Sequence, residues 1–260
     1  LYFVSFVARI VVFDSGLGSL SIIKAIQKIS KSEIIYFADQ ENFPYGQKSQ
    51  AQLSKIIEHS IKLLDKEFSP NAIVVASNTP SLMLNLSSKK IIDVKPPLKE
   101  ALKKSRTKQI GILATKSAIA SNGLTQYIKK NNFPKKFNFF KINGSDLVNL
   151  VESGKFISNK KYCNKIIKKT LKQTLYQNNI DTITLSSTHL LFLKSLLKKQ
   201  FPTINFIDPS IQVAKKTLLI TKNNQSKKNL LKIFATGNIK IFELKLNKIG
   251  IKNKVNLFPS

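Results

Sequence analysis

Cysteine is almost absent from this chain, since Cys163 is the only one in 260 residues. A single thiol excludes an internal disulfide and a cysteine-rich zinc site. Proteins without disulfides are typical of reducing compartments, so we expect a cytoplasmic setting.

Arginine and acidic residues are also scarce. Arg9 and Arg106 are the only arginines, and 43 basic residues stand against 14 acidic ones, which gives a formal net charge of +29. Such a charge suits contacts to phosphates. Arginine, however, is the usual residue for bidentate contacts to bases and phosphates, and no cluster of aromatic and basic residues stands out. We therefore interpret the charge as a lysine-rich solvated surface and expect no nucleic-acid or membrane partner, with a binding face for either as the alternative.

Long apolar runs are missing as well. The apolar N-terminal run, residues 1–13, is too short to span a bilayer. It lacks a basic region and a small-residue cleavage site, so we expect no signal peptide. The first residue is leucine, which suggests that the native chain starts elsewhere. A hydrophobic content of 42% predicts a folded chain with a sizeable core.

Glycine is sparse where a nucleotide-binding fold needs it. Residues 8–13 form a predicted strand, and Asp14-Ser15-Gly16-Leu17-Gly18 follows as a turn into a predicted helix. The turn lacks the third glycine of a dinucleotide fingerprint, and no P-loop lysine follows, so a nucleotide site is disfavoured. Asp14 ends the strand, where its carboxylate is placed either for chemistry or for capping the helix.

The central feature of the sequence is the stretch from residue 72 to residue 81. Residues 72–76 are apolar and partly β-branched, which predicts a strand of a parallel sheet that is buried on both faces. Ser77 follows, and then a helix is predicted, with Asn78 or Thr79 as its cap and Pro80 in its first turn. A helix N-terminus at the carboxyl end of a parallel strand favours a carboxylate or a phosphate.

The same construction occurs a second time. Residues 182–185 are a similar strand, and Ser187-Thr188-His189 leads into a helical pattern over residues 190–199. Two such junctions that face each other would hold a small anionic molecule from both sides. The alternative is that both are ordinary strand-to-helix turns with polar caps.

Strands and helices alternate through the whole chain, which predicts an α/β fold with parallel sheets and right-handed crossovers. No linker rich in glycine and serine interrupts the pattern. We therefore expect two domains with a tight interface, residues 1–95 plus 208–260 and residues 96–207. Further predicted strands cover residues 33–38, 90–94, 108–114, 137–142, 204–207 and 230–235, and further helices cover residues 49–68, 117–131, 145–153, 159–177, 210–220 and 239–248.

Taken in order, several short motifs resemble the glutamate racemase family of the aspartate/glutamate racemase superfamily. The first turn is similar to the DSGxGG turn of the family, Pro44-Tyr45-Gly46 to its PYG loop, and Ser77-Asn78-Thr79 to its CNT triplet. Residues 110–115 resemble its GVLAT strand, and Ser187-Thr188-His189 its CTH triplet. Each triplet is weak alone, but together they match the order of the family over nearly the whole chain.

The resemblance implies two similar doubly wound parallel-sheet domains that are related by pseudo-twofold symmetry, with the active site in the cleft between them. It implies proton transfer at the α-carbon of glutamate, with aspartate as the alternative substrate, and no cofactor or metal. A homodimer is a candidate assembly. The catalytic positions match Ser77, Ser187, Asp14, His189 and Glu152, and the substrate-binding positions match Ser15, Tyr45, Gly46, Asn78, Thr79, Thr115 and Thr188.

Both catalytic cysteines of the family are serine here, at Ser77 and Ser187, and Cys163 matches neither position. A thiol has a pKa of about 8.5, which a protein can lower toward neutrality. A serine hydroxyl is a far weaker acid and needs an adjacent general base. The other departures from the family pattern are Ser19 for a glycine, Ala118 for a threonine and Leu190-Leu191 for Tyr-Pro.

The residues are compatible with two functions from different classes. The first is a glutamate racemase-type isomerase with impaired or altered turnover, in which Asp14 and His189 assist the serines. The second is a non-catalytic binder of an acidic amino acid or a small dicarboxylate on the same fold. Serines introduced artificially to trap a substrate are a third reading.

Overall fold

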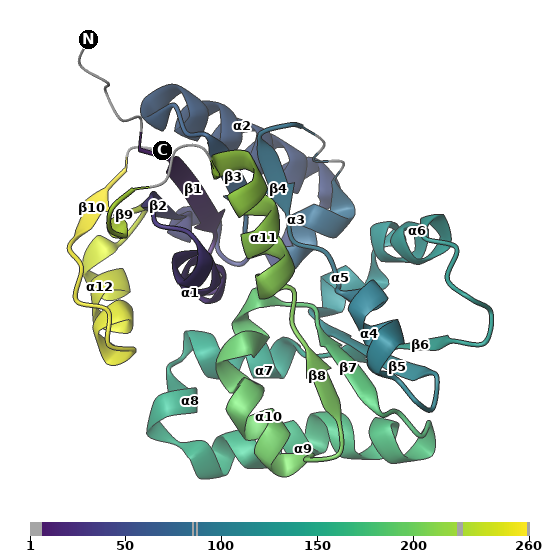
Figure 1. The fold of residues 1–260 in the computed structure, drawn as a ribbon. Coiled ribbons are helices and arrows are strands. Elements are labelled where there is room, and N and C mark those ends of the chain that lie inside the picture. The colour runs from purple at the N-terminus through teal and green to yellow at the C-terminus, as the bar shows by residue number, and fades with distance from the viewer. Residues whose placement is uncertain (1–6, 85, 87, 223–225, 259–260) are drawn as a thin grey trace.

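The computed structural model describes residues 7–84, 86, 88–222 and 226–258. The chain forms two parallel sheets with helices on their faces, stacked as an upper and a lower unit in Figure 1. This arrangement confirms the predicted α/β fold with two parallel-sheet units.

The first sheet has the strand order β10-β9-β2-β1-β3-β4, with every adjacent pair parallel. Its strands are β1 (Arg9–Asp14), β2 (Glu33–Ala38), β3 (Ala72–Val75), β4 (Ile91–Asp93), β9 (Leu230–Ala235) and β10 (Val255–Leu257). The chain runs from β1 to β2 on one side and then returns to place β3 on the other side. The carboxyl ends of β1 and β3 therefore form a switch point, where α/β proteins bind ligands.

The second sheet repeats this plan with four strands in the order β6-β5-β7-β8. They are β5 (Gln109–Ala114), β6 (Asn138–Asn143), β7 (Thr182–Leu185) and β8 (Asn205–Ile207). Its switch point lies between β5 and β7, so Thr115 and Ser186 follow the two strands that frame it.

Helices cover both sheets. The α-helices are α1 (Ser19–Ile29), α2 (Gln50–Phe68), α3 (Asn78–Met83), α4 (Leu98–Lys104), α5 (Lys116–Ala120), α6 (Asn122–Lys130), α7 (Ser145–Glu152), α8 (Lys155–Ser158), α9 (Lys160–Gln177), α10 (Lys194–Gln200), α11 (Ser210–Thr221) and α12 (Ile239–Lys248). The 3-10 helices are η1 (Gln40–Asn42), η2 (Tyr45–Gln47) and η3 (Thr188–Leu193).

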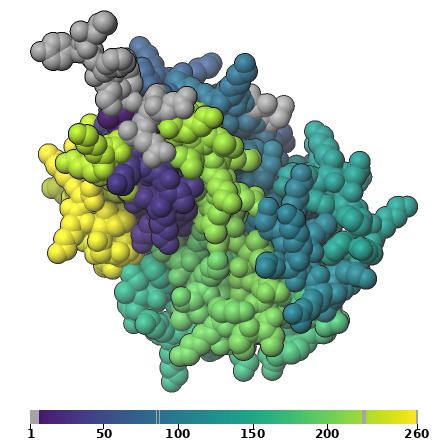
Figure 2. Space-filling view, in the orientation of Figure 1, coloured from purple at the N-terminus to yellow at the C-terminus, as the bar shows by residue number. Residues whose placement is uncertain are grey.

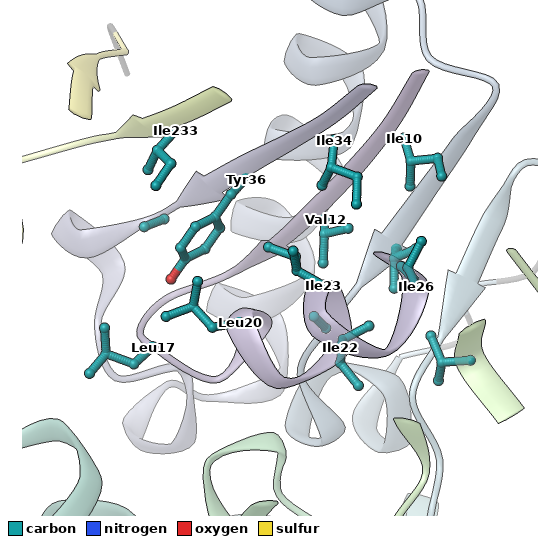
Figure 3. Close-up of a cluster of buried hydrophobic side chains, with 14 of the residues drawn as sticks. Ile10, Val12, Leu17, Leu20, Ile22, Ile23, Ile26, Ile34, Tyr36 and Ile233 are labelled. Atoms are coloured by element: carbon teal, nitrogen blue, oxygen red, sulfur yellow. The ribbon is translucent and has the colours of Figure 1, made fainter. Parts of the chain in front are cut away.

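The strands of the first sheet bury both of their faces because alternate side chains point to opposite sides. Ile10 and Val12 pack with Leu20, Ile23 and the other core residues of α1 (Figure 3). The alternate residues of β1 pack on the opposite side, against the core face of α2. Each such side chain contributes about 1.5–3 kcal/mol when fully buried, so this sheet is a rigid base for the residues at its strand ends.

The chain passes between the two sheets twice, after β4 and after β8. α11 follows β8 of the second sheet but packs on α1 of the first unit, beside β3 and β4 (Figure 1). The first and last strands, β1 and β10, belong to the first sheet, and Figure 2 shows the purple and yellow surfaces of the two described ends in the same half of the molecule.

Two predicted helices differ from the structure, and one strand was not predicted. The helix predicted over residues 117–131 is two helices, because Ser121 is extended and its Oγ accepts a hydrogen bond from Leu124 N at 3.2 Å, which starts α6 anew. The helix predicted over residues 190–199 begins as η3 and becomes an α-helix at Lys194. The edge strand β10 was not predicted, since three residues are too short to show an alternating pattern.

The apolar run of residues 1–13, for which neither a membrane span nor a signal peptide was expected, lies partly outside the described residues. Residues 1–6 are not described, and the rest of the run leads into β1. Within the described ranges, no helix is long and apolar enough to cross a membrane.

Candidate active site

The carboxyl ends of β1, β3, β5 and β7 surround a cavity of about 60 Å³. Its lining residues are Asp14, Ser15, Phe43, Pro44, Tyr45, Gly46, Ser77, Asn78, Thr79, Thr115, Val148, Ser186, Ser187, Thr188 and His189. Every residue predicted to catalyse or to bind substrate is in this set except Glu152, which contacts His189. The two switch points therefore meet at one cavity.

The first junction places Ser77 between β3 and α3. Its backbone is extended, and no side-chain hydrogen bond caps the helix. The prediction that Asn78 or Thr79 caps this helix is wrong, because both residues lie inside its first turn. Asn78 Nδ2 instead donates to Val94 O at 2.8 Å, which fixes the amide against the crossing between the units. Among the described residues Asn78 Oδ1 has no partner, although it is buried.

The second junction contacts the first directly. Thr188 Oγ1 donates to Ala76 O at 3.0 Å, and Ala76 is the residue before Ser77. Ser21 Oγ of α1 donates to Thr188 O at 3.0 Å, so the first unit holds the backbone of the second junction as well. Ser187 is extended and makes no capping bond, as at Ser77. The polar residues at both junctions are thus free of the capping role that was the alternative interpretation.

His189 is buried beside a carboxylate. Its Nε2 lies 2.7 Å from Glu152 Oε1, at the end of α7. The same oxygen accepts from Leu17 N of the first unit at 2.8 Å, and Oε2 lies 3.4 Å from Lys245 Nζ of α12. Burial raises the pKa of Glu152, but His189, Leu17 N–H and Lys245 outweigh it and hold that pKa below its usual value. Burial lowers the pKa of His189, and the hydrogen bond and charge of Glu152, with the charge of Asp14, raise it above its usual value.

Asp14 is the carboxylate among the residues that line the cavity, and it is 2% exposed. Burial is the largest cause that raises the pKa of Asp14, to about 6, against the lowering effects of His189, Ser15 N–H and Ser77. Its Oδ1 accepts from Ser15 N at 2.7 Å. Its Oδ2 is buried without a partner in the part of the chain that the structure describes. Asp14 therefore does not cap α1, whose first turn shows no side-chain cap.

Gly18 leaves room for three side chains of the cavity to converge. A Cβ atom at this position would collide with Thr188 Oγ1 and Asp14 Oδ2 and lie 2.9 Å from His189 Cε1. The glycine therefore leaves the space in which side chains of β1 and η3 meet.

The loop with Tyr45 closes one side of the cavity. Tyr45 N donates to Ser15 Oγ at 3.4 Å, and its phenol donates to Asp39 Oδ2 at 2.8 Å. Burial and the charge of Asp39 raise the pKa of Tyr45 well above its usual value, so the phenol stays neutral. Gly46 follows in η2, close to Ser117 of α5.

Two threonines meet across the units. Thr79 Oγ1 lies 3.3 Å from Thr115 Oγ1, and Thr115 also caps α5 by accepting from Ala118 N at 3.3 Å. These two hydroxyls lie at the starts of α3 and α5 and add hydrogen-bond donors to the cavity.

Two residues that support the site were not predicted. Asp39 is buried and accepts from Tyr45, and its signal in the sequence was an acidic residue directly after a buried strand. Lys245 lies on α12 far along the chain, and nothing in its local sequence marks it. Cys163 is buried in the core beside Ile167 and Leu171 of α9, away from the cavity lining.

Metal ligands do not gather at this site. In the described residues, no group of three or more His, Cys, Asp or Glu side chains is placed to hold a metal ion. The cavity instead offers hydroxyls, an amide and backbone N–H groups around Asp14 and His189. Such a set of groups suits a small polar molecule with carboxylates.

Comparisons with known proteins agree with this geometry. A glutamate racemase from Aliarcobacter butzleri is 32% identical over 227 residues, which cover 84% of this chain and 86% of the relative. The crystal structure of a glutamate racemase isoform from Bacillus anthracis has a TM-score of 0.83 and 25% identity, with 97% of each chain covered. A Francisella tularensis glutamate racemase in complex with D-glutamate has a TM-score of 0.78 and 26% identity, again over 97% of each chain. No family model matches the chain.

The fold and the cavity between two switch points define an α/β protein of the aspartate/glutamate racemase superfamily. The relatives identify the family within this superfamily: the chain belongs to the glutamate racemase family. The resemblance inferred from the motifs is thereby confirmed.

Proposed function

We propose that this chain binds glutamate in the cavity between the two sheets and interconverts its enantiomers by proton transfer at the α-carbon without a cofactor. The observation that carries the proposal is that Ser77 and Ser187, each at the end of a buried parallel strand, line one cavity with Asp14 and His189. Support also comes from the relatives, which are named glutamate racemases.

The polar groups of the cavity suit an amino acid better than a simple dicarboxylate. Backbone N–H groups at two helix starts, with the hydroxyls of Thr79 and Ser15, are donors for carboxylates. Asn78 Oδ1 and Asp14 Oδ2 are buried acceptors without a partner in the described chain. A buried acceptor without a donor costs about 1–3 kcal/mol, and an α-ammonium group supplies the missing donors.

The proposed proton transfer uses Asp14 as the proton acceptor on one side and His189 as the proton donor on the other. Asp14, with a pKa of about 6, is ionised at pH 7 and can accept a proton through the Ser77 hydroxyl. The pKa of His189 is raised by Glu152, so its imidazolium is available to supply a proton on the Ser187 side. Each hydroxyl then relays a proton between the α-carbon and the charged group behind it.

We further propose that turnover is slow. A positioned proton-transfer group contributes roughly 10²–10⁴-fold to a rate, and both positions that carry a thiol in the family pattern carry a hydroxyl here. Binding does not depend on a thiol, so the second candidate function is a binder of acidic amino acids that does not turn them over. The two serines are the observation that favours this candidate.

The test compares the parent with the double variant Ser77→Cys, Ser187→Cys. We expect the double variant to form D-glutamate from L-glutamate at least about a hundredfold faster, measured by circular dichroism. The exposed residues Ser153 and Ser158, changed to cysteine together, provide a control for added thiols.

Equal turnover of the parent and the Ser77/Ser187 variant would refute the proposed role of the serines. Calorimetry with L-glutamate on both proteins tests the ligand separately. Absence of binding in both would refute the ligand assignment itself.

The division of the chain into units is also a proposal. We propose that residues 1–95 with 208–260 form one domain and residues 96–207 the other. Support comes from the sheets, since β1 to β4, β9 and β10 share one sheet and β5 to β8 share the other.

A further inference from the structure

Lys245 reaches the site from α12, an element with no predicted site residue. Its Nζ lies 3.4 Å from Glu152 Oε2, although α12 packs on β10 of the first sheet and Glu152 ends α7 of the second unit. The same ammonium group lies 5.7 Å from the centre of the Phe43 ring. Phe43 lines the cavity. One side chain therefore contacts both the loop beside the cavity and the carboxylate behind His189.

Lys245 supplies the hydrogen bond to the second carboxylate oxygen of Glu152, Oε2. Its Oε1 is occupied by His189 and Leu17 N, at 2.7 and 2.8 Å. Its side chain is 7% exposed, and that of Lys245 is 31% exposed. Water and salt screen such a pair less than an ion pair on the open surface.

We propose that Lys245 is a positioning residue that acts through Glu152: its ammonium group lies between Glu152 Oε2 and the Phe43 ring and offsets the negative charge that Glu152 presents to His189. This inference rests on the proposed function for the part that His189 plays in proton transfer. The contacts themselves form a series across both units: Phe43 with Lys245, Lys245 with Glu152, and Glu152 with His189.

The charges around His189 determine whether replacement of Lys245 raises or lowers the pKa of His189. Glu152 and Asp14 raise the pKa of His189, and Lys245 lowers it. α1, which also packs on η3, presents the uncharged Ser21 to Thr188 O and the Lys24 ammonium to the Phe192 ring. When the positive charge of Lys245 is removed, the imidazolium form becomes more favourable. His189 should then titrate at a higher pH.

The test uses the histidine titrations in NMR spectra of the full chain. The chain has only two histidines, and His59 is exposed on α2, so it serves as an internal reference. Lys245→Met removes the charge and keeps the apolar stem, and Lys248→Met removes the same charge from an exposed site on the same helix. We expect the titration midpoint of His189 to rise in Lys245→Met only, and to return toward the parent value in Lys245→Arg.

Two outcomes would overturn the inference. One is an unchanged His189 midpoint in Lys245→Met, and the other is an equal shift in Lys248→Met. Lys245→Gln is the second variant if the methionine variant does not fold. L-glutamate affinity of the parent, measured by calorimetry, separates the two proposals, since a parent that does not bind glutamate refutes the proposed function while the His189 titration still reports on Lys245.

Discussion

The substitution Asp14→Asn should make the protein more stable at neutral pH while it removes a proposed base. Asp14 is 2% exposed, and burial is the main cause that raises its pKa from 3.8 to about 6. Asparagine has the same shape and keeps an oxygen that accepts from Ser15 N–H. The variant therefore removes a buried charge and keeps the local hydrogen bond.

The size of the effect follows from the pKa shift. One pKa unit corresponds to about 1.4 kcal/mol, so the ionised Asp14 side chain costs the folded state about 3 kcal/mol at pH 7. The folded protein binds this proton more tightly than the unfolded chain does. The cost is therefore absent below about pH 4, grows as the pH rises, and is complete above about pH 6. The amide N–H₂ group at the position of Oδ2 is a buried donor that costs about 1–3 kcal/mol at every pH, which offsets part of the gain.

The assay is urea denaturation at a series of pH values between 4 and 8, followed by circular dichroism. We expect the difference in unfolding free energy between Asp14→Asn and the parent to change by about 3 kcal/mol in favour of the variant from pH 4 to pH 7. Asp146→Asn is the control, because Asp146 is exposed and carries the same charge. A difference that stays constant with pH would refute the reasoning, since it would mean that Asp14 titrates alike in both states.

The remaining predictions concern Glu152 and Gly18, which contact or make room for the titratable side chains of the cavity. Glu152→Ala should destabilise the fold by about 3–5 kcal/mol in denaturant titrations, because it leaves His189 and Leu17 N–H buried without their partner. Glu152→Gln should cost less, and equal losses in both variants would contradict the argument. Gly18→Ala should cost about 1–3 kcal/mol and weaken L-glutamate binding, since the methyl group collides with Asp14 Oδ2. A variant as stable and as tightly binding as the parent would contradict the crowding at Gly18.

Much of the fold was predictable because its elements carry local signals. The apolar runs that became β1, β3, β5 and β7 are short and bounded by polar turns, and the amphipathic pattern of residues 49–68 became α2. In parallel sheets the carboxyl ends of strands share one edge. The residues after β1 and β3 therefore share one edge, and those after β5 and β7 share another. That the two junctions with Ser77 and Ser187 face each other was a hypothesis from their repeated pattern and the family resemblance, and the structure brings both to one cavity.

The wrong predictions of a helix cap and a helix boundary arose where tertiary contacts outweigh the local conformational preference of the residues. Asn78 has a good capping side chain, but its amide donates to Val94 O across 16 residues instead. The helix predicted over residues 117–131 breaks at Ser121, where Gly123 packs against the backbone of Leu82. Except for proline, a helix propensity is worth at most about 1 kcal/mol per residue, which a single buried contact can offset.

The sequence by itself determined the residue types at the strand ends, among them Ser77 and Ser187, and the alternation that makes parallel sheets. Only the tertiary structure decided how these residues are linked. Thr188 reaches Ala76 across 112 residues, Leu17 reaches Glu152 across 135, and Lys245 reaches Glu152 across 93. No local pattern encodes such pairs, because they depend on how two units dock. The pKa of Asp14 follows from the same docking, since burial between the units is what removes its carboxylate from water.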